Sequence, residues 1–197
     1  MTTPPVSRRD RKKAVTRQAI ADAALRLFLA HGYDDVGIRD IADAADVSTA
    51  TVFKHFSGKE ALVFDQDQDR EAELIAAVRQ RTAGQSVVDA LRQHFLDLRS
   101  SVEEHPQATE FTHLVESTPA LREYAERMWT RHAAGLGAAI ADEFGVDHDD
   151  LACAALARFV LDIPALARGR QDRGGVIEGV FDILDRGWRP PAGRPAR

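Results

Sequence analysis

The chain has 197 residues, of which 44% are hydrophobic and 29% are charged. This length is enough for one large domain, or for a small domain joined to a medium one. No apolar run approaches the roughly 20 residues of a membrane-spanning helix, and the first residues lack the apolar stretch of a signal peptide. The single cysteine, Cys153, excludes an internal disulfide and a zinc site built from thiolates. We therefore expect a soluble, cytoplasmic protein.

The composition and the spacing of apolar residues favour an all-α fold. The chain has 32 alanines but only two tyrosines and two tryptophans, and no stretch alternates β-branched with polar residues. Pro164 should kink or shorten the eighth expected helix. Helical spacing of apolar residues predicts nine helices, over residues 10–31, 38–45, 49–55, 59–81, 87–105, 107–116, 119–144, 151–168 and 176–188.

Charge is distributed unevenly along the chain. The formal net charge is −5, yet residues 1–60 carry 10 Lys/Arg against 8 Asp/Glu, and residues 61–197 carry 16 against 23. All four lysines lie in the first part. A small basic module that contacts a polyanion, followed by a larger acidic module, fits this asymmetry.

We expect four regions in the chain. Residues 1–9 should form a flexible arm and residues 189–197 a disordered tail, since five of the eight prolines lie there. Residues 10–57 should form a small helical domain. Residues 58–188 should form a larger one.

Residues 38–56 predict two short helices joined by a tight turn. Asp46 and Val47 lie in the turn, and Ser48 is placed to cap the second helix. Ala42 supplies the small side chain that a close helix crossing needs. The outward face of the second helix then carries short polar or basic groups suited to base edges and phosphates in a major groove, namely Thr49, Thr51, Lys54 and His55.

A helical hairpin can also bind another protein, so an all-α small-molecule-binding or protein-interaction module without DNA binding is the alternative. Six basic residues among residues 8–17, and the placement of Lys54 and Lys59, favour DNA. An enzyme is not expected, because the sequence lacks the common phosphate-loop, nucleophile and metalloprotease motifs. Glu110 and His113 have di-iron spacing, but that motif occurs once where two copies are needed. No metal or cofactor is expected.

Five segments in this region share the order and spacing of a known family. They are Gly32-Tyr33, Arg39-Asp40-Ile41-Ala42, Val47-Ser48, Val52-Phe53-Lys54-His55-Phe56 and Lys59-Glu60-Ala61-Leu62. Together they resemble the N-terminal signature of TetR-family transcriptional regulators, over about residues 14–64. The nine-helix layout that follows is similar to the family in architecture only.

The resemblance implies a homodimer with two DNA-binding heads. It assigns Lys59 to a phosphate at the start of the fourth helix. Three positions depart from the family pattern: Gly37 replaces a Ser or Thr cap, Asp46 replaces the turn glycine, and Phe53 replaces a tyrosine. Carried over position by position, the residues that face DNA are Arg39, Ser48, Thr49, Ala50, Thr51, Phe53, Lys54, His55 and Lys59.

The resemblance also implies a ligand cavity in the larger part and dimerisation through the last two helices. Aromatic and apolar side chains with a few polar groups suit a mostly hydrophobic ligand. The candidate ligand residues are Phe95, Leu98, Phe111, His113, Leu114, Met128, Trp129, His132 and Phe159. The candidate dimer interface consists of Leu156, Val160, Ile163, Ile177, Val180, Phe181 and Leu184. The expected function is a repressor that a small, mostly hydrophobic molecule releases from a palindromic operator.

Overall fold

The computed structural model describes residues 7–103, 106–167, 170 and 172–187 of the chain. These residues contain helices and no strand, so the predicted all-α fold is confirmed. None of the helices in these ranges combines the length and apolar character needed to cross a bilayer. Most of the expected N-terminal arm, residues 1–6, and the expected C-terminal tail, residues 189–197, lie outside the described residues.

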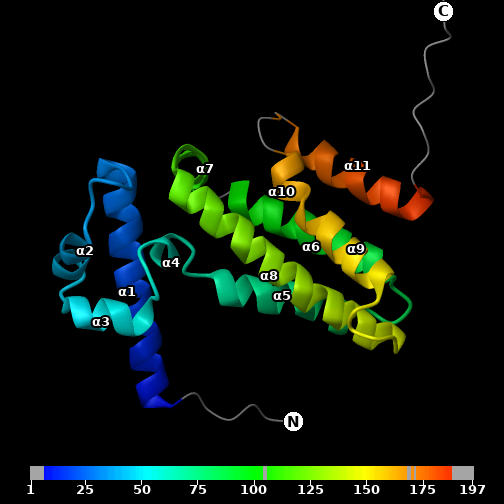
Figure 1. Cartoon of the computed structure of the whole chain (residues 1–197), viewed down its shortest axis with the longest axis horizontal. Helices are drawn as coiled ribbons and strands as arrows, with labels where there is room; N and C mark the ends of the chain where they lie inside the picture. The colour runs from blue at the N-terminus through cyan, green and yellow to red at the C-terminus, as the bar shows by residue number, and fades with distance from the viewer. Residues whose placement is uncertain (1–6, 104–105, 168–169, 171, 188–197) are drawn as a thin grey trace, which may run out of the picture. The chain divides into compact units, whose positions relative to one another are not determined.

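Eleven helical segments make up the described part of the chain (Figure 1). Ser7 caps the first of them through its side chain, so this helix begins two residues earlier than expected. The helices are α1 (Arg8–His31), α2 (Ile38–Ala44), α3 (Thr49–His55), α4 (Glu60–Val63), α5 (Asp67–Arg79), α6 (Val87–Glu103), α7 (Ala108–Ser117), α8 (Pro119–Phe144), α9 (Leu151–Leu161), α10 (Ile163–Leu166) and α11 (Arg173–Arg186).

The helices divide into two compact units. Unit 1 contains the described residues of Met1–Asp67 together with Gln107–Ala125, and unit 2 contains those of Gln68–Pro106 together with Glu126–Arg197. Helix α7 and the first turns of α8 therefore belong with the N-terminal helices, although they come late in the sequence.

Unit 1 packs α2, α4 and α7 against α1, and α3 against α2. Its core contains Ile20, Phe28, Ile41, Val52 and Leu62, none more than 1% exposed. Burial of these side chains is the main stabilising term for a unit of this size, at roughly 1.5–3 kcal/mol each.

Unit 2 has a separate core. Helix α11 packs along α6, and Phe181 of α11 tilts against Phe95 of α6 with ring centroids 6.0 Å apart. Leu91 and Leu136 are fully buried in the same cluster. The Arg92 guanidinium of α6 is also paired with Asp185 of α11. Apolar burial and a charged contact therefore hold the same pair of helices together.

Two of the nine expected helices are each split into two. The helix expected over residues 59–81 ends at Val63 and restarts at Asp67. Phe64 ends α4 with φ −106° and ψ 47°, because its ring packs between Tyr124 and Phe111 in the core of unit 1. The helix expected over residues 151–168 is divided at Asp162, two residues before Pro164, which was expected to kink or shorten it because proline lacks an N–H.

Arg17 of α1 connects three segments of unit 1. Its Nη1 donates to the carbonyl of His55, the last residue of α3, at 2.6 Å, and its Nη2 donates to the carbonyl of Asp65 at 2.9 Å. The guanidinium also lies 4.3 Å from the centre of the Phe56 ring. One side chain thus fixes the end of α3 and the bend after α4 against α1, because a guanidinium presents several donors in a rigid plane.

We expect Arg17→Gln to destabilise the protein by about 1–3 kcal/mol, since it removes charge-assisted bonds to two carbonyls at a half-buried position. Urea unfolding followed by far-ultraviolet circular dichroism measures this cost. Arg26→Gln, which changes an exposed arginine on the same helix, serves as the control and should stay within about 0.5 kcal/mol of the parent. Equal unfolding midpoints for the two variants would contradict the role given to Arg17.

Candidate DNA-binding surface

The turn between α2 and α3 has a defined hydrogen-bond pattern. The N–H of Val47 donates to the carbonyl of Ala42 at 2.9 Å, and the N–H of Asp46 donates to the carbonyl of Asp43 at 3.2 Å. This pair of bonds is the Schellman arrangement, in which the residue after the helix end takes a left-handed conformation. Asp46 takes it here, with φ 52°, where glycine is usual. Aspartate tolerates this region better than most side chains do.

Side chains cap the starts of both helices. Ser48 Oγ accepts from the N–H of Thr51 at 3.1 Å and lies 2.9 Å from its Oγ1. Gly37 has no side chain to cap α2, but the Asp40 carboxylate accepts from the Gly37 N–H at 2.7 Å. The departure at Gly37 is therefore offset by a bond from within the first turn of α2.

One face of α3 is open to solvent. Val52 is buried, while Thr49, Ala50, Phe53 and Lys54 are exposed, and Phe53 as a residue is 59% exposed. These side chains suit DNA. The methyl groups of Thr49 and Ala50 and the Phe53 ring can contact thymine methyls, the Thr49 hydroxyl can bond base edges, and the Lys54 ammonium can bind a phosphate.

Most of the remaining predicted DNA-binding residues have side chains that are less accessible or already hydrogen-bonded. Ser48 and Arg39 are exposed, with Arg39 on α2, but the Ser48 and Thr51 hydroxyls are engaged with each other. His55 is half-buried, and its Nδ1 has no hydrogen-bond partner. Burial and the neighbouring cations of Lys13, Arg17 and Lys54 lower the pKa of His55, so the imidazole is neutral at pH 7.

Lys59 faces the interior of unit 1 instead of projecting freely. Its ammonium donates to the carbonyl of Tyr33 and lies 4.1 Å from the centre of the Tyr33 ring and 5.6 Å from that of Phe28. Helix α4, at whose start it lies, is only four residues long. A phosphate contact by Lys59 would have to compete with these bonds.

The predicted ligand residues fall into both units. In unit 1, Phe111 and Leu114 pack with the core, and His113 is exposed on the same helix. In unit 2, Trp129 stacks edge-on against His132 at 5.4 Å, and His132 is 1% exposed. The other members in unit 2 are buried Phe95 and Met128, half-buried Leu98 and 37%-exposed Phe159.

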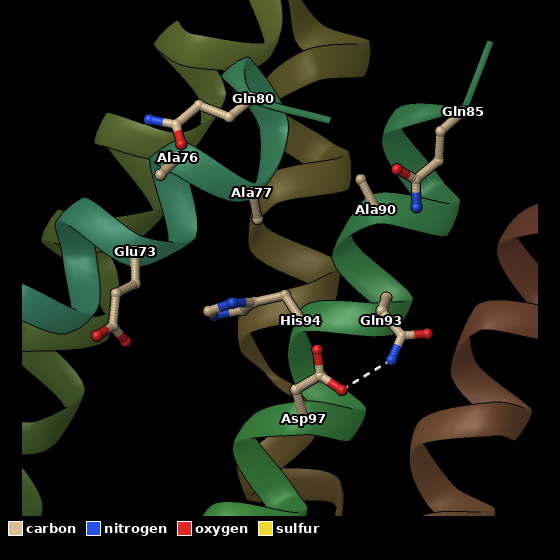
Figure 2. Close-up of a pocket in the computed structure, with 9 residues that line it drawn as sticks. All are labelled: Glu73, Ala76, Ala77, Gln80, Gln85, Ala90, Gln93, His94 and Asp97. Atoms are coloured by element: carbon tan, nitrogen blue, oxygen red, sulfur yellow. Dashed lines mark hydrogen bonds between the residues drawn. The ribbon is translucent and has the colours of Figure 1, made fainter. Parts of the chain in front are cut away.

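Unit 2 contains an open groove of about 430 Å³ between α5 and α6 (Figure 2). The His94 imidazole projects from α6 toward α5, and the Glu73 and Asp97 carboxylates lie on the two helices beside it. Burial lowers the pKa of His94, so the ring is neutral at pH 7 although both carboxylates act against this shift. The groove contains none of the nine predicted ligand residues. Its lining residues are Glu73, Ala76, Ala77, Gln80, Gln85, Ala90, Gln93, His94 and Asp97.

The predicted dimer residues are mostly occupied within unit 2. Five of the seven, Val160, Ile163, Ile177, Val180 and Phe181, are at most 6% exposed in the single chain. Ile177, Val180 and Phe181 lie on α11, which packs along α6, and Val160 of α9 and Ile163 of α10 belong to the same buried cluster. Leu156 and Leu184 are half-buried. The exposed apolar side chains of α9, α10 and α11 include Phe159, Leu166 and Ile183, at 37%, 45% and 41%.

Sequence reasoning missed two features of these sites. Arg17 was counted only as one of several basic residues, and no local pattern indicates that it bonds carbonyls 38 and 48 residues away. The groove did have a signal. Residues 73, 76, 77 and 80, and residues 90, 93, 94 and 97, have the spacing of helix faces that pack together, yet they hold small and polar side chains.

Two family models match the chain. The model for bacterial regulatory proteins of the TetR family matches residues 20–65, which include α2, the turn and α3. A model described as the MftR C-terminal domain matches residues 85–189, more than half of the chain.

Curated relatives and solved structures agree with these models. TcmR of Streptomyces glaucescens, an HTH-type transcriptional regulator, is 31% identical over 72% of this chain and 66% of its own length. MftR of Mycobacterium tuberculosis, described as a regulator of mycofactocin biosynthesis, is 30% identical over 64% of each chain. This chain thus spans slightly less than two thirds of both relatives.

Solved structures share the fold. SmeT, the repressor of the Stenotrophomonas maltophilia multidrug efflux pump SmeDEF, superposes with a TM-score of 0.56 at 16% identity, over 92% of this chain and 94% of its own. The fatty acid degradation regulator FadR of Bacillus halodurans gives 0.51 at 19% identity, over 87% and 99%.

The matched relatives are all described as transcriptional regulators. Among the residues that the structure describes, no group of three or more His, Cys, Asp or Glu side chains could hold a metal ion. The two family models, the curated relatives and the helix-turn-helix geometry all lead to the same conclusion: the chain belongs to the TetR family of bacterial regulatory proteins.

Proposed function

We propose that the protein is a transcriptional regulator that binds double-stranded DNA through α3 and responds to a small molecule bound in unit 2. One observation carries the DNA-binding part. The Schellman turn at Asp46 and the cap at Ser48 hold α3 against α2 with its polar face outward. A second helix presented in this way enters a major groove with its N-terminal residues near the base edges.

The exposed groups of α3 divide into two roles. Thr49 and Ala50 lie in the first turn and suit base edges and thymine methyls, whereas Lys54 lies in the last turn and suits a phosphate. Phe53 offers an apolar ring but no hydroxyl donor. Specificity thus rests on the first turn of α3, and part of the affinity rests on its last turn.

We expect Thr49→Ala to change the base preference at one or two positions, and Lys54→Ala to weaken binding to all sequences alike. The second variant should also lower the slope of log K against log salt by about one, because one phosphate contact is lost. Selection from a random DNA pool followed by fluorescence anisotropy at several salt concentrations measures both effects. Arg79→Ala, an exposed cation of α5, is the control.

If the unmodified protein selects no sequence and its DNA binding is absent even in low salt, the helical hairpin has another partner. The alternative of an interaction module without DNA binding would then hold. An unchanged preference in Thr49→Ala together with an unchanged slope in Lys54→Ala would contradict the orientation of α3 proposed here.

We also propose that the protein is a homodimer that reads a palindromic operator, with the exposed side chains Phe159, Leu166 and Ile183 in the interface. Their exposure supports this, since a two-fold contact would remove these large apolar side chains on neighbouring helices from water. Leu156 and Leu184 are half-buried and can complete the contact. The buried residues of the earlier expectation would stabilise these helices from within.

The dimer is tested by placing a charge in its interface. We expect Ile183→Asp to convert a species near twice 21.7 kDa into a monomer at micromolar concentration, because a carboxylate would be desolvated in the contact. Analytical ultracentrifugation measures the mass. Val15→Asp, at a 70%-exposed valine of unit 1, is the matched control and should leave the mass unchanged. Identical masses for both variants would exclude Ile183 from the interface.

The groove between α5 and α6 is our candidate for the effector site. Its alanines leave space, and its two carboxylates favour a ligand with a positive charge, although Asp97 also accepts a bond from Gln93 Nε2 at 2.7 Å. This differs from the mostly hydrophobic ligand expected from the aromatic residues. Ligand and DNA must weaken each other's binding by the same factor if the ligand acts as a release signal.

We expect benzyltrimethylammonium to bind this groove better than neopentylbenzene, its uncharged isostere. Glu73→Gln combined with Asp97→Asn should reduce that binding about tenfold, at roughly 0.5–1 kcal/mol for each exposed charge pair. Nuclear magnetic resonance shifts of the His94 imidazole report binding. Asp69→Asn, an exposed carboxylate of α5 outside the groove, is the control. Equal binding of the charged and uncharged compounds would exclude a charge-selective site.

A further inference from the structure

Helix α1 continues past the point where it meets α3. The bond from Arg17 Nη1 to the His55 carbonyl, at 2.6 Å, fixes the C-terminal end of α3 beside Arg17. Residues 8–16 of α1 lie beyond this contact, and at a rise of 1.5 Å per residue they add about 13 Å of helix. Figure 1 shows this blue end of α1 extending beyond α3.

This extension carries a dense positive charge. Arg8, Arg9, Arg11, Lys12 and Lys13 are all exposed. The single carboxylate among residues 8–16, that of Asp10, accepts a bond from Ser7 Oγ at 2.7 Å at the helix start. None of residues 8–16 is buried, and the one large apolar residue among them, Val15, is 70% exposed. The extension therefore resembles a polyanion-binding surface more than a packing surface.

The positions of two of these cations are set by helical spacing. Arg9, Lys13 and Arg17 are four residues apart and lie along one side of α1, and Arg17 marks this as the side that faces the end of α3. Besides burial, the cations of Lys13 and Lys54 both lower the pKa of His55, so both lie near its imidazole. Together with the Arg17 bond to the His55 carbonyl, this places Lys13 of α1 and Lys54 of α3 near the same end of α3.

We propose that Arg9 and Lys13 bind backbone phosphates of the DNA that flanks the segment read by α3, so that each head contacts more DNA than its recognition helix covers. The inference rests on the proposed function and adds a second contact region to it. From Arg9 to Arg17 the helix rises about 12 Å, which matches the rise of three to four nucleotides along one strand. The contact adds affinity for DNA of any sequence, since phosphates carry no base information.

The partner is DNA instead of a membrane because the extension lacks an apolar face. A helix that lies in a bilayer surface buries large apolar side chains opposite its charges, and residues 8–16 offer only Ala14 and Val15. This side of α1 also adjoins the end of α3 through the Arg17 bond, so a duplex bound to α3 would lie near it.

The test compares three double variants on a random-sequence duplex of about 40 base pairs. Arg9→Ala with Lys13→Ala removes both charges, Arg9→Lys with Lys13→Arg keeps them, and Arg26→Ala with Arg122→Ala removes two exposed cations elsewhere in unit 1. Far-ultraviolet circular dichroism checks that each variant is folded. We expect the first variant alone to lower the salt slope by about 1.8, so that the affinity lost between 50 and 200 mM salt shrinks about tenfold.

A second arm varies the DNA. The unmodified protein should bind a selected operator more tightly when about six base pairs flank it on each side, and the double alanine variant should not benefit from the flanks. An unchanged salt slope, or an equal benefit from the flanks in both proteins, would overturn the inference while leaving α3 as the reading helix. If the unmodified protein binds no duplex at 50 mM salt, the proposed function and this inference both fail.

Discussion

The hydrogen bond from the Val47 N–H to the Ala42 carbonyl sets the geometry on which the candidate DNA-binding surface depends. It closes the turn that fixes α3 against α2, and it forms only because Asp46 takes a left-handed φ of 52°. The same turn places Ser48 where its hydroxyl caps α3. Without this bond the exposed face of α3 would have no fixed direction relative to the core of unit 1.

The sequence allowed the local structure to be predicted well because caps, turn residues and helical spacing are local signals. Ser48 and Gly32 mark a helix start and a helix end that the structure also has, and Pro164 marks a break. The split at Phe64 was not predictable from neighbours, because the ring is held by Tyr124 and Phe111, far along the chain. Tertiary contacts override helix propensity there.

In the candidate sites too, features set by local sequence were predictable and features set by tertiary contacts were not. The open face of α3 follows from a short amphipathic helix with one buried residue, Val52, and was predictable. The burial of Val180 and Phe181 was not, because an apolar helix face looks identical whether a partner subunit or a helix of the same chain covers it. The groove was not predictable from aromatic residues, because its space comes from small side chains such as Ala76 and Ala90.

The basic residues of unit 1 differ in what their charges can do. Arg17 and Lys59 direct donors to backbone carbonyls of unit 1, so they fix its shape, and those donors are not free to bond phosphates directly. His55 is neutral at pH 7 because burial and neighbouring cations lower its pKa. A count of cations would therefore overestimate the salt dependence of binding, which follows the number of phosphates neutralised. The exposed cations of α1, Arg39 of α2 and Lys54 of α3 are the candidates to supply it, so the proposed function draws affinity and specificity from different parts of unit 1.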